Sequence, residues 1–308
     1  MQVNIDGQQT LLDRVIEWVH SNLDRFLTCG ANSQPNNQRV QPLSELALFC
    51  WLLRERNVSF AGDDRLWLCL RRISETFRNA VFFERLFRVP DPVVSQALIA
   101  IALHRTGLLP GEDLRLLQKM IDSTNVLSSE RLPHRQLELR HILEAGGFNF
   151  RLPSYKAMFR ASAAAKPLNP IYVTDFDAYS LTHTLFYCSD FGSREVAGAS
   201  PQQLRRISKS IEALLGMYTV KGNWDLVAEL LLCSHCVRKT DSLLYACSWK
   251  ELVRSQWDCG VVPGPSYNRE KEQGLLDEER QNYVFQECYH TTLVSGLASA
   301  LCPSPTGD

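Results

Sequence analysis

Three side chains capable of proton transfer interrupt apolar stretches of this sequence. His183 lies within SLTHTLFYCSDFG, Glu229 within LVAELLLC and His290 within CYHTTLV. Residues three, four or seven positions apart share one face of a helix, which places Tyr179 and Asp190 on the face of His183. A histidine between a tyrosine and a carboxylate is a candidate general base.

The same pattern also has a purely structural interpretation. A histidine in an apolar helix can be a core residue with one hydrogen bond, and Asp190 can cap the end of its helix. However, titratable groups left unsatisfied in a core cost about 1–3 kcal/mol each. We therefore expect His183, Glu229 and His290, with Tyr179, to line one polar cleft, and His183, His290, Glu229, Tyr179 and Asp190 are the candidate catalytic residues.

Further polar side chains near these positions are candidates for binding substrate. Gln286 precedes His290 by one helical turn, and the adjacent Thr291 and Thr292 either satisfy one another or line a cavity. Basic residues near position 155 could contact an anionic ligand or form a solvated helix face. The candidate substrate-binding residues are Tyr289, Thr292, Gln286, Trp257 and Arg160.

Two histidines and a carboxylate can also bind zinc or iron, so His183, Glu229 and His290 form an alternative metal set. Their spacing matches no recognised metal motif, and we expect no cofactor. Signatures of nucleotide binding, zinc proteases and serine hydrolases are absent. Cys233 and Cys236 form a C-x-x-C, but no strand precedes it, which argues against a thioredoxin-like redox pair.

Helical periodicity recurs along the chain and strand alternation does not. The pattern predicts an all-α fold of about twelve helices in consecutive antiparallel hairpins, forming an α/α toroid, with an irregular α-solenoid or a two-lobed helical bundle as alternatives. We expect a single domain over residues 1–308, with residues 1–30 as a peripheral helix. Residues 32–42 are predicted to be a loop, Asp63 or Asp64 an N-cap, Asp91–Pro92 a helix start and Gly107 a helix stop.

Composition excludes several classes of partner. The net charge is −1 and the pI about 6.7, so neither nucleic acid nor a membrane surface is an expected partner. No apolar run approaches the length of a membrane span. The first residues lack the pattern of a secretory signal, and the 10 cysteines are therefore expected to be free thiols in the cytoplasm.

Four stretches between about residue 140 and 302, YSLTHTLFYCSDFG, DLVAELLLC, QWDCGVVPGP and CYHTTLVSGLA, resemble the signature stretches of an uncharacterised bacterial family. That family occurs in actinobacterial and related genomes, often near natural-product genes. Cys188 stands where a small hydroxyl residue is more usual. SQWDCGVVPGP also resembles turns of toroidal terpene cyclases and six-hairpin glycosidases, which supports the fold more than an activity. The acidic motifs of terpene cyclases are absent.

These observations lead to three functional hypotheses. The first is a small-molecule or peptide-tailoring enzyme of a biosynthetic pathway, in which histidine acid–base chemistry drives a cyclisation, elimination or hydrolysis. The second is a non-catalytic helical module that binds a peptide, a carrier or a partner enzyme. The third is a metal-dependent enzyme with a His/Glu site. The sequence does not define the oligomeric state.

Overall fold

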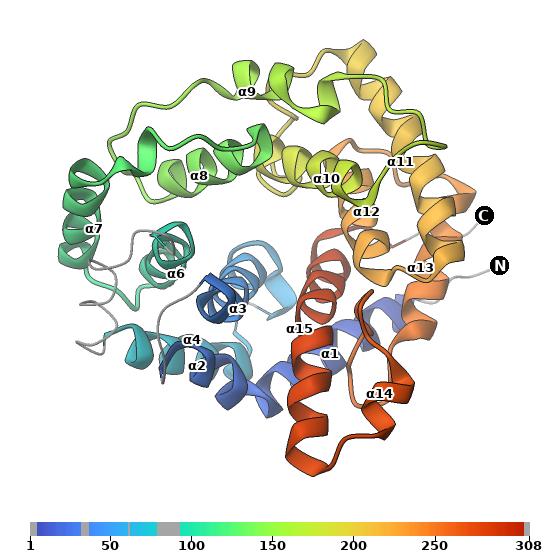
Figure 1. The fold of residues 1–308 in the computed structure, drawn as a ribbon, viewed down its shortest axis with the longest axis horizontal. Helices are drawn as coiled ribbons and strands as arrows, with labels where there is room; N and C mark the ends of the chain where they lie inside the picture. The colour runs from blue at the N-terminus through green and yellow to red at the C-terminus, as the bar shows by residue number, and fades with distance from the viewer. Residues whose placement is uncertain (1–4, 32–36, 61, 79–92, 305–308) are drawn as a thin grey trace. The chain divides into compact units, whose positions relative to one another are not determined.

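The computed structural model describes residues 5–31, 37–60, 62–78 and 93–304. Within these ranges the secondary structure consists of fourteen α-helices and three short 3₁₀ helices, without a strand (Figure 1). The predicted all-α fold is confirmed. No helix in the described ranges has the length and apolar character needed to cross a membrane. The closure of the helices into a toroid and the cytoplasmic location stay predictions.

The chain divides into two compact units. Unit 1 comprises residues 1–15, 132–138 and 153–308, and unit 2 comprises residues 16–131 and 139–152. Two helices, α1 (Ile5–Ser21) and α8 (Pro133–Ala145), contribute residues to both units. The expectation of a single domain stays a prediction.

Unit 2 is built around α3 (Asn37–Arg56), which packs against three other helices of the unit. These are α2 (Leu23–Ala31), α4 (Asp64–Phe77) and α6 (Val93–Arg105), and α7 (Gly111–Ser123) packs in turn on α6. The buried face of α3 includes Phe49, Leu52 and Leu53, which have no exposed surface.

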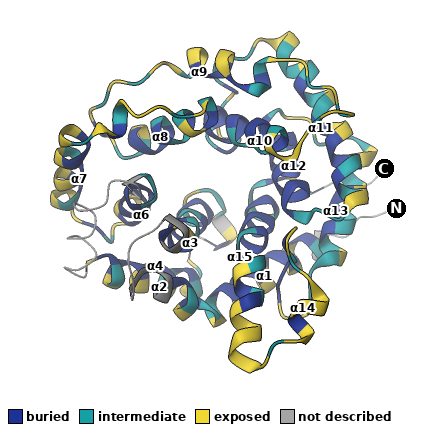
Figure 2. Cartoon of the chain, viewed as in Figure 1, coloured by how far each residue is buried: buried dark blue, intermediate teal, exposed yellow. Residues whose placement is uncertain are grey.

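Unit 1 is built around α12 (Trp224–Cys236), in which every residue except Trp224 and His235 is buried (Figure 2). A helix that is apolar on all sides must be covered on all sides. Four helices cover α12, namely α10 (Asp175–Ser189), α11 (Pro201–Lys221), α13 (Leu243–Ser255) and α15 (Asp277–Leu301). The short helices α9 (Tyr155–Ala161) and α14 (Arg269–Gln273) complete the unit.

The first and last helices of the chain meet in unit 1 (Figure 1). The Gln8 side chain donates a hydrogen bond to the carbonyl oxygen of Cys302, and the Ser299 hydroxyl donates to the carbonyl oxygen of Gln8. Gln256 donates to the carbonyl oxygen of Leu11. The apolar side chains of Leu11, Leu12 and Val15 on the same helix are buried.

Local signals in the sequence locate some helix ends and not others. Asp63 is the N-cap of α4, and Gly107 has a φ of 79° just after the end of α6, as predicted. The loop predicted for residues 32–42 is wrong from residue 37 onwards, because α3 begins at Asn37 and contains Pro42. Proline near the start of a helix removes only one hydrogen bond and can be accommodated. The start predicted at Asp91–Pro92 lies outside the described residues.

Candidate active site

Two carboxylates lie on one face of the central helix of unit 1. Asn223 caps α12 by accepting a hydrogen bond from the backbone N–H of Leu226, and this starts the helix just before Asp225. Glu229 follows Asp225 by four residues, so the two side chains are neighbours on the helix surface. Their side chains are only 4% and 2% exposed, respectively. Burial of two carboxylates this close requires specific partners.

The Asp225 carboxylate is held by two hydroxyl groups. The Tyr179 hydroxyl on α10 donates to Asp225 Oδ2 at 2.6 Å, and the Thr291 hydroxyl on α15 donates to Oδ1 at 3.1 Å. The Nε2 atom of His290 lies 3.6 Å from the same Oδ1 atom. Asp225 therefore connects α12 to α10 and α15.

The Glu229 carboxylate lies between two histidines. The hydroxyl of Thr182 on α10 donates a short hydrogen bond to Glu229 Oε2. His183 Nδ1 lies 3.8 Å from the same oxygen, and His290 Nε2 lies 3.8 Å from the other oxygen, Oε1. These histidine contacts are longer than hydrogen bonds and act through charge. Either histidine, when protonated, stabilises the ionised carboxylate.

His183 has a defined orientation within a group of aromatic rings. Its Nδ1 atom lies 2.9 Å from the carbonyl oxygen of Tyr179, one turn earlier on α10. A carbonyl only accepts, so this hydrogen bond assigns the proton to Nδ1 and leaves the Nε2 lone pair available in the neutral ring. The rings of His134 and Phe186 lie 6.0 and 5.9 Å away, respectively, between centroids.

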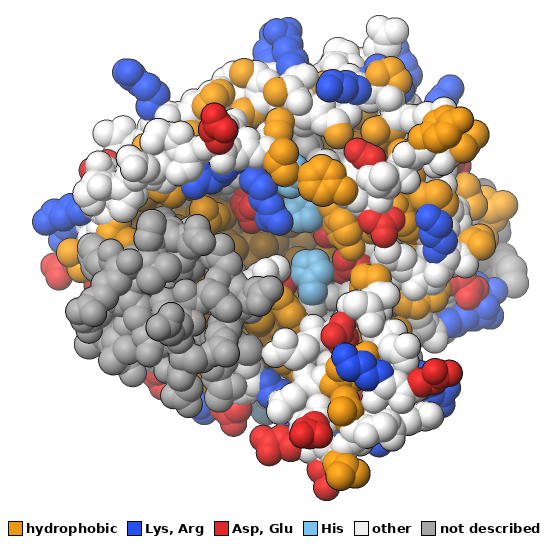
Figure 3. All heavy atoms as spheres, viewed as in Figure 1, with side chains coloured by type: hydrophobic (Ala, Val, Ile, Leu, Met, Phe, Trp, Pro, Cys, Tyr) orange, Lys and Arg blue, Asp and Glu red, His pale blue; other side chains and the backbone are white. Residues whose placement is uncertain are grey.

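Both histidines of the cluster reach the surface. The side chain of His183 is 19% exposed and that of His290 is 38% exposed. Figure 3 shows histidine side chains beside acidic ones on the face of the molecule that it presents. Solvent and solutes can therefore reach the imidazoles, although the carboxylates behind them are buried.

The two carboxylates differ in their preferred protonation state. Burial raises the pKa of Asp225 above its ordinary value; His290 opposes the rise and the charge of Glu229 adds to it. Burial alone would also raise the pKa of Glu229, but His183, His290 and the Thr182 hydroxyl together lower it. Glu229 is therefore the carboxylate that holds the negative charge, and Asp225 is the one that takes a proton more readily.

One subset of the cluster has the composition of a metal site. Asp225, Glu229 and His290 each offer one ligand atom, and the three atoms lie within 4.8 Å of one another. The metal set expected from the sequence contained His183 in place of Asp225. Nδ1 of His183 faces the carbonyl oxygen of Tyr179, and the ring contacts Glu229 only at Oε2, the oxygen held by Thr182.

The structure brings together four of the five candidate catalytic residues, Tyr179, His183, Glu229 and His290. It does not bring Asp190 to them. Asp190 has a φ of 51°, caps the C-terminal end of α10 and accepts a hydrogen bond from the Ser193 hydroxyl. The expectation that it continues the helical face of His183 is wrong, because the helix ends before it.

The candidate substrate-binding residues have different surroundings, and their role stays a prediction. Thr292 is buried, and its hydroxyl accepts from the backbone N–H of Val262 and donates to the carbonyl oxygen of Val262, a structural role. Tyr289 stacks on Phe285 and lies 6.3 Å from His290 between ring centroids. Trp257 packs against Tyr267, Gln286 is exposed on α15 one turn before His290, and Arg160 is exposed on α9.

Sequence reasoning missed Asp225 and Thr182 as members of the cluster, and it noted Thr291 without its partner Asp225. Asp225 precedes Glu229 by four residues in DLVAE, and this spacing was the available signal. It was weak, because an acidic residue in the first turn of a helix commonly stabilises the helix dipole. Nothing local in the sequence indicates that Thr182 and Thr291 donate to these carboxylates.

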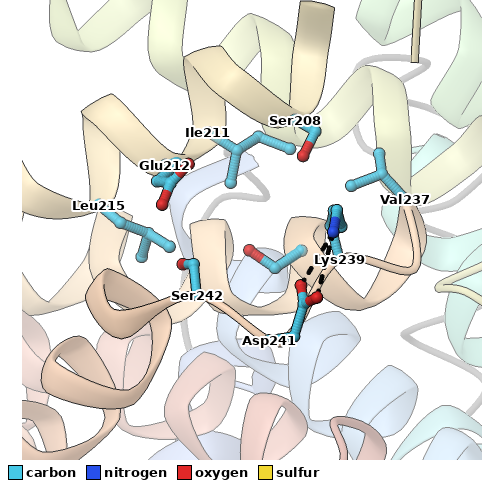
Figure 4. Close-up of a pocket in the computed structure, with 9 residues that line it drawn as sticks. Ser208, Ile211, Glu212, Leu215, Val237, Lys239, Asp241 and Ser242 are labelled. Carbon is cyan, nitrogen blue, oxygen red and sulfur yellow. Dashed lines mark hydrogen bonds and ion pairs between the residues drawn. The ribbon is translucent and has the colours of Figure 1, made fainter. Parts of the chain in front are cut away.

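A separate cavity of about 250 Å³ opens where α11 meets the C-terminal end of α12 (Figure 4). The ion pair between Lys239 and Asp241 lies at its edge, with Ser208, Glu212 and Ser242 among the other lining residues. No member of the histidine–carboxylate cluster lines this cavity. Because the cluster combines buried carboxylates with accessible imidazoles, it is a stronger candidate for an active site than this cavity.

Comparison with known proteins gives a family but no activity. The model of a family described as a domain of unknown function (DUF6895) matches residues 12–300. No curated protein and no solved structure matches the chain.

Proposed function

The chain belongs to the DUF6895 family, and we propose that it is an enzyme that transforms a small molecule or a peptide by proton transfer. The observation that carries this proposal is the position of His183 and His290 on the two sides of Glu229. Each lies 3.8 Å from a different oxygen of this buried carboxylate. Because both contact one side chain, they are close enough to act on one substrate.

His183 has the arrangement of a general base. Its Nδ1–H faces the Tyr179 carbonyl oxygen and the Glu229 carboxylate, so its Nε2 lone pair is the group left to accept a proton from the substrate. The negative charge of Glu229 stabilises the imidazolium that forms. A carboxylate near Nδ1 serves the same purpose in catalytic triads, where it orients the imidazole and stabilises its cation.

His290 can supply the second proton transfer. It is the more exposed of the two histidines and lies beside Asp225, the carboxylate that takes a proton more readily. Protonated His290 can donate to a leaving group or a developing oxyanion, while the two carboxylates stabilise its charge. A base and an acid in this arrangement suit an elimination, a cyclisation or a hydrolysis.

The other residues of the cluster act as positioning residues. Thr182 holds Glu229, and Tyr179 holds both Asp225 and, through its backbone carbonyl, the ring of His183. Catalysis depends on groups that are already oriented before the substrate binds. The resemblance noted in the sequence supports a biosynthetic pathway as the setting for this reaction.

The proposal is tested by incubating a fractionated bacterial metabolite and peptide extract with purified protein and comparing masses before and after. We expect the wild-type protein to convert specific compounds, and His183→Ala and His290→Ala to abolish the conversion without loss of fold by circular dichroism. His20→Ala, on α1, is the matched control and retains conversion. The enzyme proposal is wrong if the wild type converts nothing, or if both variants convert as well as the wild type. Compounds retained unchanged on the immobilised protein would instead favour a binding module.

A further inference from the structure

We infer that Asp225, Glu229 and His290 form a binding site for a first-row divalent metal ion such as Mn²⁺, Fe²⁺ or Zn²⁺. The site lies within the centre of the proposed function, but the inference rests on coordination geometry and can be tested without a known substrate.

The spacing of the three ligand atoms suits one ion. His290 Nε2 lies 3.6 Å from Asp225 Oδ1 and 3.8 Å from Glu229 Oε1, and all three ligand atoms lie within 4.8 Å of one another. Nitrogen and oxygen ligands bound to one ion at about 2.0–2.2 Å are roughly 3–3.5 Å apart. Side-chain shifts of less than about 1 Å therefore bring the three atoms to bonding distance.

In each carboxylate a hydroxyl group from α10 holds one oxygen, and the other oxygen is the one nearest the imidazole of His290. Tyr179 binds Asp225 at Oδ2 and Thr182 binds Glu229 at Oε2, while Oδ1 and Oε1 are the atoms nearest His290. Hydrogen bonds from the surrounding shell orient metal ligands in this way. These two hydroxyl groups belong to α10, and the Thr291 hydroxyl on α15 also donates to Asp225 Oδ1, so two other helices orient the carboxylates on α12.

The charge of the site also calls for a cation. Within the described part of the chain, neither Asp225 nor Glu229 forms an ion pair with lysine or arginine, and their only cationic partners are the two histidines. Two buried carboxylates paired only with imidazoles repel one another whenever the imidazoles are neutral. A divalent ion balances both carboxylates without requiring a protonated histidine.

The proposed site is open on one side. Three protein ligands leave at least one coordination position for water or substrate, as in catalytic zinc sites. His290 is the partly exposed ligand, whereas both carboxylates are buried, so the open position lies toward solvent on the imidazole side. Mixed carboxylate and imidazole ligands fit manganese, iron and zinc better than calcium or copper(I). Metal binding and proton donation by His290 exclude one another, because both use its Nε2 atom, so with metal bound His183 is the histidine left for proton transfer.

Manganese is the best probe, because the nine cysteines whose side chains are described could bind zinc elsewhere, whereas thiolates are poor ligands for Mn²⁺. Chelator-stripped full-length protein is titrated with MnCl₂, and free Mn²⁺ is followed by electron paramagnetic resonance. We expect one ion per chain. His290→Ala and Asp225→Asn should weaken binding on the order of tenfold or more, as even loss of an outer-shell partner costs that much.

Two controls separate this inference from the proposed function. Glu195→Gln removes an exposed charge from unit 1 and should leave Mn²⁺ binding unchanged. His183→Ala should retain Mn²⁺ while losing substrate conversion. The inference is overturned if the wild type binds no Mn²⁺ at millimolar concentration, or if His290→Ala and Asp225→Asn bind it as the wild type does. In either case His183→Ala still tests the proposed function separately.

Discussion

Replacement of Asp225 by asparagine should make the metal-free protein more stable, although it removes a residue of the candidate site. The change keeps the size of the side chain and removes its charge. An amide can still accept the hydrogen bond of Tyr179 through its oxygen and donate to the Thr291 hydroxyl through its nitrogen, so both neighbours in the native structure remain satisfied.

The size of the effect follows from the spacing of the carboxylates. The ligand oxygens of Asp225 and Glu229 lie within 4.8 Å of each other, where two unit charges at an effective dielectric constant of 20 repel by about 3 kcal/mol. Attraction to His290 and the stronger hydrogen bond that Tyr179 makes to a charged acceptor offset part of this repulsion. We therefore expect a net gain of about 1–2 kcal/mol for Asp225→Asn, since removal of buried charge with its partners satisfied is stabilising.

Thermal unfolding in EDTA measures this gain. At about 2.1 cal/mol/K of unfolding entropy per residue, 1 kcal/mol corresponds to roughly 1.5 °C for 308 residues, so the melting temperature of Asp225→Asn should rise by about 1.5–3 °C. Asp225→Ala, which leaves the Tyr179 hydroxyl without its acceptor, should lower it instead. Equal losses of stability in the asparagine and alanine variants would refute the reasoning, because the charge itself would then be stabilising. In buffer without EDTA, added Mn²⁺ should raise the melting temperature of the wild type more than that of Asp225→Asn.

Three further outcomes are expected. Burial and the charge of His183 lower the pKa of His134 to about 4. Between about pH 6.5 and pH 4 the unfolded chain therefore binds a proton that the native protein does not. The stability that this group contributes above about pH 6.5 should be lost as the pH falls toward 4. Urea unfolding should give a free energy about 2 kcal/mol lower at pH 5 than at pH 7 from this group, and His134→Gln should show a smaller difference. Thr292→Val should lower stability by about 1–3 kcal/mol in the same assay because it leaves the N–H and carbonyl groups of Val262 unpaired, and Thr292→Ser should not. All 10 cysteines should titrate as free thiols under denaturing, non-reducing conditions, and Cys233, whose pKa is raised by burial, should not react with a thiol reagent in the native protein.

The parts of the site that lie on one helix were accessible from the sequence. The apolar surroundings of Glu229 show that its helix is covered on all sides, and a carboxylate in such a helix must be paired or face a polar space. The same argument applied to His183 and His290. This argument selected the three residues but did not show which of their atoms lie together, because periodicity describes each helix separately and not the contacts between helices.

The incorrect or missing assignments depend on packing between distant segments. Thr292 was assigned to substrate because nothing near it in the sequence shows that Val262 takes up its hydroxyl. That contact exists because the turn before α14 lies against α15. Gly264 in this turn is so close to α15 that a Cβ atom on it would lie 1.9 Å from the backbone oxygen of Glu287. Asp190 was misplaced because the end of α10 depends on two successive residues with positive φ, Asp190 and Phe191, and neither is glycine.

The meeting of α1 with α15 has a consequence for folding during synthesis. Gln8 and its partner Cys302 are 294 residues apart, so the apolar stripe of α1 emerges from the ribosome long before the helix that holds it in place. Contacts of such separation form late and carry a large loop-closure entropy. Throughout that interval Gln8 lacks its native partners at the C-terminal end of the described chain, while Leu11, Leu12 and Val15, all buried in the native protein, lie on the same helix. His290 is also synthesised late, so the candidate active site cannot assemble before α15 has left the ribosome.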